Sequence, residues 1–346
     1  MYILGDFASP HNKIASNFAP DEESHILINI EGYLVEQKIP PTNKYGVYNN
    51  INSLSHFSPN KTIFAFANNH VADTDTGVSE SISISKKNGY RYVGIGQNLS
   101  EAKRPLHIVE KDQEISIINS GWSLIGCKSA KKTKSGTSPL VENLIIEKIK
   151  QEKIHNKRIL VFLHWGYETE IYPLPLHREM AKKFIDNGAN IVVGCHSHCI
   201  QGYEEYKNSH IFYGLGNSCF EQKFYYSGTL SFPSYCEKGL IVKWDPILNK
   251  CEAAISKYHQ KEQKYFLESF QPINKISEIV DLSSFKHLTD REYIAFFKKN
   301  RIKKLLLPIF HNSDRSVEYL LNSVFLSIRT LLIELLLLVK LKKRNR

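Results

Sequence analysis

The amino-acid sequence predicts an α/β protein whose functional site lies at the carboxyl ends of its strands. Two observations favour this fold class. Short apolar runs alternate with segments of helical character, and five of the apolar runs end in residues that can bind a metal. Continuous apolar runs of this length are typical of strands buried on both faces. In open α/β sheets, ligands bind beyond the carboxyl ends of the strands.

The five runs follow one another along the chain. With the polar residues that follow them, they are 1–5 before Asp6, 25–30 before Glu31, 62–67 before Asn68, Asn69 and His70, 159–163 before His164, and 189–193 before His196 and His198. A lone histidine is more often a packed or solvated residue than a metal ligand. Five strand ends that each carry a possible ligand are not independent chance events, and they favour a metal site. Imidazole, carboxylate and amide oxygen suit Mn, Fe or Zn. Three or more histidines with two acids exceed what one tetrahedral ion needs, so we expect two divalent cations.

The segments between these runs predict helices, a loop and a hairpin. A loop beside the site is expected over residues 37–52, which are rich in Pro, Asn and Tyr. Segments 239–244 and 251–258 flank a turn and predict a hairpin that completes the sheet. Helices are predicted at 76–88, 144–153 and 175–187.

The motifs at the strand ends belong to a longer ordered series. It consists of Gly5-Asp6, Asn29-Ile30-Glu31-Gly32, Ala67-Asn68-Asn69-His70, Gly94-Ile95-Gly96-Gln97-Asn98, His164-Trp165-Gly166, Gly194-Cys195-His196-Ser197-His198 and Tyr213-Gly214-Leu215-Gly216-Asn217. In order and number these motifs resemble the CapA family, which is associated with bacterial capsule and poly-γ-glutamate synthesis. The resemblance runs from residue 1 to about residue 222.

The resemblance implies a calcineurin-like metallophosphoesterase fold, a sandwich of two β-sheets flanked by helices with a dinuclear metal site. We expect this domain to span 1–280, and a basic helical C-terminal region to span 281–346. The metal ligands implied by the resemblance are Asp6, Glu31, Asn69, His164, His196 and His198.

The reaction that we expect is metal-assisted hydrolysis of a phosphoester, with a phosphorylated or anionic polymer or glycan as the substrate. His70 would then protonate or stabilise the leaving oxygen. Asp73, three residues further on, would orient His70, although a helix N-cap is the alternative role for Asp73. Two other functions stay open: a non-catalytic polymer-binding component of a capsule assembly complex, and a nucleotide phosphoesterase unrelated to capsules.

The sequence departs from related sequences at Ala8, at Ser197, and at Ser218-Cys219-Phe220, which follows the Leu-Gly-Asn motif where an aromatic residue is usual. Many phosphoesterases of the superfamily have Asp-x-His in the first motif, and Ala8 occupies that histidine position here, as is common in CapA-like sequences. The loss thins the ligand set of the first ion. Ser197 stands between the paired histidines where proline is usual.

The net charge of +10 is concentrated near the C-terminus. Residues 291–346 contain 13 Lys and Arg against 4 Asp and Glu, so the other 290 residues are almost neutral. An even basic surface is therefore absent, and we do not expect a nucleic-acid-binding protein.

The distal tail, residues 323–346, is apolar and then basic. Arg329 and Glu334 interrupt the apolar run, and a charge near the bilayer centre is costly, so we do not expect a membrane span. An amphipathic helix on an anionic membrane is one expectation, with its basic end formed by Lys340, Lys342, Lys343, Arg344 and Arg346. The alternative is a helix packed on its own domain or on a partner such as a polymer-synthesis complex.

We expect a cytoplasmic protein, with peripheral attachment to the inner face of the membrane as an open alternative. No apolar signal segment precedes the first strand, and the six cysteines lack a disulfide rhythm. Cys195 and Cys199 flank the paired histidines, and could either join them in a zinc knot or pack as small apolar residues.

Overall fold

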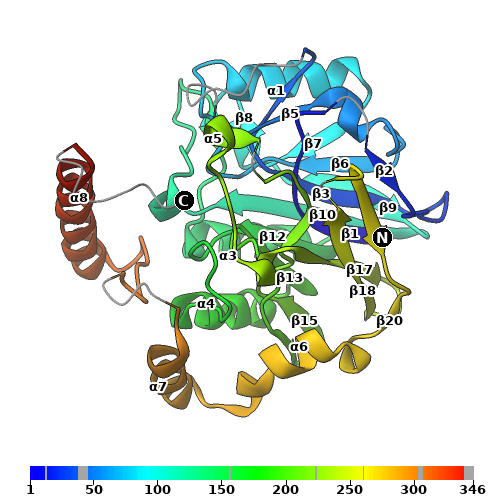
Figure 1. Cartoon of the computed structure of the whole chain (residues 1–346). Coiled ribbons are helices and arrows are strands. Elements are labelled where there is room, and N and C mark those ends of the chain that lie inside the picture. Colours follow the sequence, from blue (N-terminus) through cyan, green and yellow to red (C-terminus); the bar gives the residue numbers. More distant parts are fainter. Residues whose placement is uncertain are drawn as a thin grey trace.

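Two β-sheets lie face to face at the centre of the molecule (Figure 1). The computed structural model describes residues 1–11, 14–37, 46–155, 157–222, 224–259, 261–302 and 307–338. The first sheet has the order β2 (Ala15–Ser16), β19 (Lys264–Leu267), β18 (Lys250–His259), β17 (Lys238–Asp245), β1 (Tyr2–Ala8), β3 (Ile26–Ile30), β6 (Thr62–Ala65) and β7 (Arg91–Val93), with β16 (Asn217–Phe220) beside β1 and β20 (Gln271–Pro272) beside β18. The second has the order β14 (Tyr203–Tyr206), β15 (Ser209–Phe212), β13 (Ile191–Cys195), β12 (Arg158–His164), β10 (Gln113–Gly121) and β9 (Leu106–Glu110).

The central strands are buried on both faces, as their continuous apolar runs predict. Ile3 of β1 and Leu27 of β3 pack between the sheets, in one cluster with Leu160 and Phe162 of β12. Leu4 and the alternate residues of its neighbours face the outer layer instead. Side chains on successive strand residues point to opposite faces, so a run without polar interruption serves both layers.

Helices cover the outer face of each sheet. α1 (Gly77–Lys87) lies over the first sheet, and α3 (Glu142–Lys153) and α4 (Pro175–Asp186) lie over the second. These three helices confirm the predictions for 76–88, 144–153 and 175–187 to within two residues at each end. The described part of the chain also contains α2 (Leu99–Ala102), α5 (Tyr225–Gly228), α6 (Ser277–Leu282), α7 (Asp290–Asn300) and α8 (Ser316–Leu338), and 3₁₀ turns at Ile51–Leu54, Ser123–Ile125, Ser234–Cys236, Ile273–Lys275 and Ser284–His287.

The parallel strands bring their carboxyl ends to one edge of the sandwich. β1 pairs in parallel with β3, and β3 with β6, while β12 pairs in parallel with β10 and β13. The predicted hairpin is present as the antiparallel pair of β17 and β18. The strand ends that carry the candidate ligands are therefore divided between two sheets whose edges meet.

The loop predicted over residues 37–52 is partly wrong. Its residues 38–45 lie outside the described part of the chain, but β5 (Tyr48–Asn50) forms a parallel pair with β4 (Tyr33–Val35). A second small sheet joins β8 (Ile95–Gly96) to β11 (Gly136–Thr137). Pairs this short leave no periodic pattern in the sequence, because two or three residues cannot establish an alternation.

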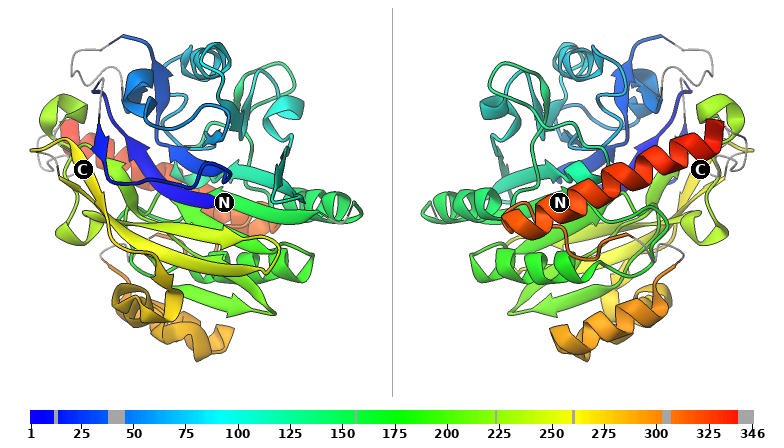
Figure 2. Two further views of the ribbon diagram at one scale, coloured as in Figure 1. Left: turned by 90° about the vertical axis from the view of Figure 1, so that its right-hand side faces the viewer. Right: turned by 90° about the vertical axis from the view of Figure 1, so that its left-hand side faces the viewer.

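In the C-terminal region, the residues before α8 pack closely on the sandwich, whereas α8 itself packs loosely. Phe285, Tyr293 and Phe297 are buried in the cluster beneath α4. α8 instead runs along the outside of the molecule (Figure 2). Among the residues described, no helix is both long enough and apolar enough to cross a membrane. The basic residues at 340–346 lie outside the described part of the chain.

Candidate metal centre

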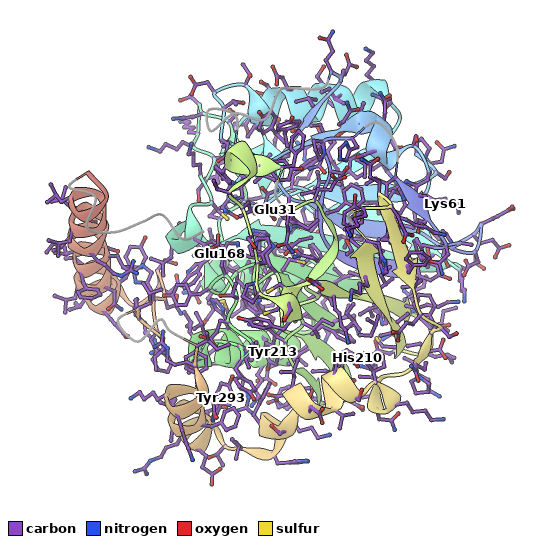
Figure 3. All side chains as sticks on the ribbon, in the orientation of Figure 1. Glu31, Lys61, Glu168, His210, Tyr213 and Tyr293 are labelled. Atoms are coloured by element: carbon purple, nitrogen blue, oxygen red, sulfur yellow. The ribbon has the colours of Figure 1, made fainter. Side chains whose placement is uncertain are left out.

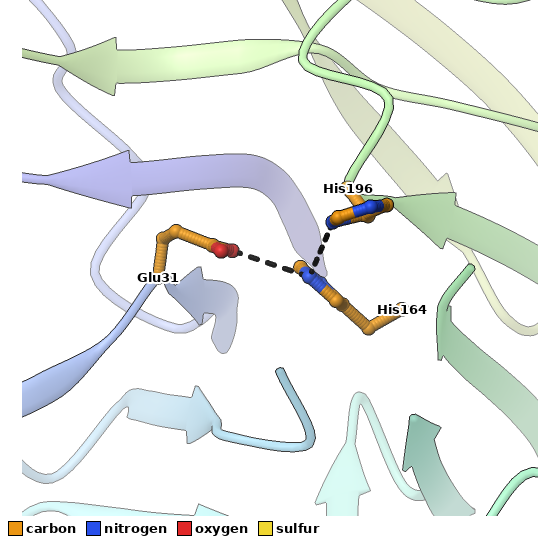
Figure 4. Close-up of side chains that lie close together, drawn as sticks. All are labelled: Glu31, His164 and His196. Atoms are coloured by element: carbon orange, nitrogen blue, oxygen red, sulfur yellow. Dashed lines mark hydrogen bonds and ion pairs between the residues drawn. The ribbon is translucent and has the colours of Figure 1, made fainter. Parts of the chain in front are cut away.

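Side chains from three other strand ends converge on His164, the last residue of β12, and two of them, Glu31 and His196, are drawn in Figure 4. Nε2 of His164 lies 3.1 Å from Nδ1 of His196 and 3.4 Å from Oε2 of Glu31. Asn69, which follows β6, places its Oδ1 atom 2.8 Å from the same nitrogen. Atoms that share one ion at about 2.1 Å lie roughly 3 Å apart, so these spacings match a set of ligands around one cation.

Polar atoms without partners support the same interpretation. Among the residues that the structure describes, the buried atoms Glu31 Oε1 and Asn29 Oδ1 have no hydrogen-bond partner. Buried polar atoms are paired in the great majority of cases, and an unpaired one calls for an ion or another explanation. Glu31, His164 and His196 offer ligand atoms that all lie within 4.8 Å of one another. Their nitrogen and carboxylate donors suit a divalent transition metal, so the residues present fit a metal ion.

A second group of donors adjoins the first. Asp6 in β1 places Oδ2 3.2 Å from Nδ1 of His198, and that nitrogen also lies 2.9 Å from Oδ1 of Asn217. The backbone N–H of His196 donates to Asp6 Oδ2 over 3.2 Å. Nδ2 of Asn29 donates to Asp6 Oδ1 over 2.8 Å and to Glu31 Oε2 over 3.1 Å. Asp6 and Asn29 thus join the two groups into one buried cluster.

The paired histidines reach the site through an unusual backbone. His196 has φ of 91° and His198 has φ of 57°, both in the left-handed region. Such conformations are costly for residues with a side chain and cluster at functional sites. Gly194 precedes them where the Trp165 indole donates to the Tyr213 carbonyl over 3.0 Å, and a Cβ at Gly194 would lie 2.0 Å from that carbonyl oxygen. Only glycine fits between the Tyr213 carbonyl and the Trp165 indole, so the turn must begin with a residue that has no side chain.

Within the cluster, the two acids have pKa values shifted in opposite directions, and so do the histidines His164 and His198. Burial, reinforced by the charge of Asp6, raises the pKa of Glu31 to about 8. Burial would also raise the pKa of Asp6, but contact with His198 outweighs it and the pKa is lowered. For His198, burial would lower the pKa, and Asp6 outweighs that effect and raises it to about 10. Burial lowers the pKa of His164 to about 3, so this imidazole is neutral and able to bind a cation.

His70 lies beside these donors and is held by Asp73. Nδ1 of His70 lies 2.7 Å from Oδ2 of Asp73, and the Tyr226 hydroxyl lies 3.4 Å from the same nitrogen. Burial would lower the pKa of His70, but the hydrogen bond and charge of Asp73 raise it. Asp73 also accepts from the Val47 backbone N–H over 3.2 Å. The N-cap of α1 is Thr76, so the structure places Asp73 against His70 and not at the start of that helix.

The structure brings all eight candidate residues to this edge, and adds others that sequence reasoning did not assign. Asn29 lies near the end of an apolar run and opens one of the ordered motifs, but no role was assigned to it from the sequence. Asn217 belongs to one of the ordered motifs, which was the available signal. Glu168 follows the His164 motif in a loop, and its charge helps to raise the pKa of both His70 and His198 (Figure 3).

The cysteines near the paired histidines are packed, and the Cys195 thiol borders the cluster through a hydrogen bond to Asp6. Cys195 and Cys199 are both buried free thiols, and Cys199 Sγ donates to the Glu170 carbonyl over 3.2 Å. Among the residues described, the set of converging ligands contains no cysteine. This arrangement favours the packing interpretation over a zinc knot.

Comparison with known proteins places the matched region over this site. A family model described as bacterial capsule synthesis protein PGA_cap matches residues 6–222. The PGA biosynthesis protein CapA of Bacillus subtilis is 29% identical over 224 residues, which cover 64% of this chain and 53% of that protein. The capsule biosynthesis protein CapA of Bacillus anthracis is 30% identical over 166 residues, 46% of this chain and 40% of that protein. The chain thus spans about half, or less, of the length of these relatives.

Solved structures have lower sequence identity to the chain. A 5′-nucleotidase precursor from Thermus thermophilus aligns over 68% of this chain and 42% of its own, with 13% identity and a TM-score of 0.33. The NAD nucleotidase of Haemophilus influenzae aligns over 68% of this chain and 45% of its own, with 10% identity and a TM-score of 0.32. Scores this low carry no inference about activity.

Proposed function

Because this chain belongs to the bacterial capsule synthesis protein family, whose model matches more than half of it, we propose that it is a metal-dependent phosphoesterase of capsule, exopolysaccharide or poly-γ-glutamate biosynthesis. The observation that carries the metal-dependent part is the convergence of Glu31, His164 and His196 on a common point, with Asn69 beside them. The substrate that we propose is a phosphorylated or anionic polymer or glycan.

We propose that the site holds two divalent cations of Mn, Fe or Zn. Glu31, Asn69, His164 and His196 would hold one, and Asp6 and His198 would contribute to the other. The separation of the donors into two adjoining groups supports this number. Bound there, divalent cations supply positive charge that lowers the pKa of a water molecule and neutralises phosphate oxygens.

The residues of the chain itself prepare the rest of the reaction. Asp73 holds one ring nitrogen of His70 and raises its pKa, so the other ring nitrogen can carry a proton for the leaving oxygen. Asn29 holds the carboxylates of Asp6 and Glu31 in one orientation through its two hydrogen bonds. Burial of these groups keeps bulk water from competing for their donor atoms.

Metal analysis combined with a phosphodiester assay tests the proposal. We expect purified protein to carry a divalent metal and to hydrolyse a chromogenic phosphodiester when Mn²⁺ is added. His164→Ala should lose both metal and turnover. His107→Ala is a matched control, because His107 is half-exposed and pairs with Glu152 away from the site.

The outcomes separate the parts of the proposal. Metal content unchanged in His164→Ala would contradict the candidate centre. Metal that is retained by the wild-type protein without turnover on any phosphoester would remove hydrolysis and leave a polymer-binding role. Hydrolysis of nucleotides with no effect on capsular polymer would point instead to a nucleotide phosphoesterase.

A further inference from the structure

The outward face of α8 is a continuous strip of exposed apolar side chains. Nine large apolar residues between 317 and 335 have exposed fractions from 43% to 72%. They are Val317, Leu320, Leu321, Val324, Phe325, Ile328, Leu331, Leu332 and Leu335. At a rise of 1.5 Å per residue this strip is about 27 Å long. Contiguous exposed apolar patches of such extent mark interaction sites.

The side of α8 that faces the protein carries Tyr319, Asn322 and Ser323 beside Leu326, so the more polar side is turned inward, which reverses the usual arrangement. Asn322 donates to the Phe310 carbonyl over 2.7 Å, and Tyr319 stacks on His311 with ring centroids 4.4 Å apart. Arg315, just before the helix, pairs with Glu179 of α4 at 3.1 Å. These contacts fix the rotation of α8 about its axis, so the apolar strip is held outward.

We propose that the outward face of α8 binds in the plane of an anionic lipid bilayer. The nine side chains of the strip are aliphatic apart from Phe325 and include none of the Tyr, Trp and Arg that are enriched in protein–protein interfaces. The sequence that follows α8 contains five basic residues between 340 and 346 and no acidic one. An apolar strip followed by basic residues complements both the hydrocarbon boundary and the negative headgroups of such a bilayer.

The position of α8 fits a flat partner. It is the outermost element on its side of the molecule (Figure 1), and it runs across that side along its whole length (Figure 2). A planar surface can therefore contact the entire strip without first meeting the sandwich. This inference is independent of the proposed catalytic function.

Vesicle co-sedimentation of the full chain tests the inference. We expect binding to vesicles of phosphatidylcholine with phosphatidylglycerol, weaker binding to phosphatidylcholine alone, and loss of the difference at high salt. The variant Leu320→Glu/Val324→Glu/Leu331→Glu should bind at least about tenfold more weakly, because three charges would enter the apolar boundary. Ile154→Glu is the matched control, since Ile154 is 78% exposed at the end of α3 and should not matter.

Two further variants separate the contributions. Replacing the five basic residues after position 339 by Gln should weaken binding to the anionic vesicles, by roughly fivefold for each residue that reaches the surface, with little change on the neutral ones. Phe325→Trp should show a blue-shifted emission when anionic vesicles are added. Sedimentation velocity without lipid gives the rival outcome. A dimer that the triple Glu substitution dissociates, together with no vesicle binding by the wild type, would overturn the proposal and assign the face to a second copy of the chain.

Discussion

Two fully buried carboxyl groups, Asp6 and Glu31, face the same site with opposite pKa shifts. His198 compensates Asp6, whereas Glu31 is raised by burial and by the charge of Asp6 itself. A lone ionised carboxylate is very costly in such surroundings. A divalent cation beside Glu31 would supply the compensating charge, because coordinated acids are held in the ionised form. The uncompensated charge of an ionised Glu31 therefore explains why these residues fit a metal ion.

His70 can be separated from the metal donors by substitution. His70→Asn should keep the bound metal and lower phosphodiester turnover by roughly 10²–10⁴-fold, the usual range for a lost general acid. Metal analysis and turnover on one preparation give the two readouts. Asp73→Asn should lower turnover less, since it removes only the group that holds His70. Simultaneous loss of metal and activity in His70→Asn would instead make His70 a ligand.

His177 predicts an effect of acid on stability. It lies stacked on Trp165, with ring centroids 4.4 Å apart, and burial lowers its pKa to about 3. The unfolded chain, with an ordinary histidine pKa near 6.5, therefore binds a proton that the folded protein excludes between these values. The contribution of the neutral ring to the free energy of unfolding is fully present above pH 6.5. It decreases by about 1.4 kcal/mol for each pH unit below 6.5, down to the folded pKa.

The substitution His177→Phe keeps the stacked ring and removes this titration. Chemical denaturation in a chelating buffer at pH 7 and pH 5 measures the difference. The wild-type protein should lose about 2 kcal/mol more than the variant over this interval. Equal losses in both proteins would show that His177 does not titrate in this range.

At the scale of elements, the turn after β13 joins the backbone to the site. Apolar runs followed by polar residues predicted the strands. A strand that is buried on both faces has apolar side chains at successive positions, and polar side chains occur where the strand ends. The positive φ angles of His196 and His198 could not be predicted in this way, since they depend on what crosses the turn. Asn29 belongs to one of the quoted motifs, but its role could not be assigned from the sequence, because its hydrogen bonds to Asp6 and Glu31 are visible only when the three residues are placed together.

Gly194 should be the least replaceable residue of this turn. Gly194→Ala would push a Cβ into the Tyr213 carbonyl and the Trp165 indole, and should cost about 1–3 kcal/mol or more of unfolding free energy. Gly89→Ala serves as a comparison, because Gly89 has a positive φ of 76° but its Cβ would meet Pro59 only at 3.6 Å. It should cost about 1 kcal/mol. Equal destabilisation in denaturant melts would show that the crossing over Gly194 can relax.

At the scale of the whole molecule, α8 stands apart from the sandwich. The apolar clusters of the described residues include Phe285, Tyr293 and Phe297 of the preceding region, but none of the residues of α8. The sequence predicted a basic helical region after 280 from its charge and apolar run. It left open whether the helix packs on its own domain, because that depends on which side of the helix meets Phe310 and His311.

Removal of the chain after Asn322 should leave the sandwich folded. The remaining residues keep Tyr319 and Asn322, so calorimetry should give a thermal midpoint within about 2 °C of the full chain. Phe297→Ala is the contrasting change, because Phe297 is fully buried and its removal should cost about 3–5 kcal/mol. A large fall in the midpoint of the truncated protein would show that α8 stabilises the fold.

The donors of the candidate centre come from both sheets, with Asp6, Glu31 and Asn69 from one and the histidines of β12 and β13 from the other. A cation bound there would link the two sheets at the edge that they share. Amide hydrogens at the ends of β3 and β13 should then exchange with solvent in concert, and should slow together when Mn²⁺ is added. Amides in β9, at the far border of the second sheet, should not respond. The ion would thus control the opening of the strand ends at this edge, while the apolar layer continues to hold the rest of the two sheets together.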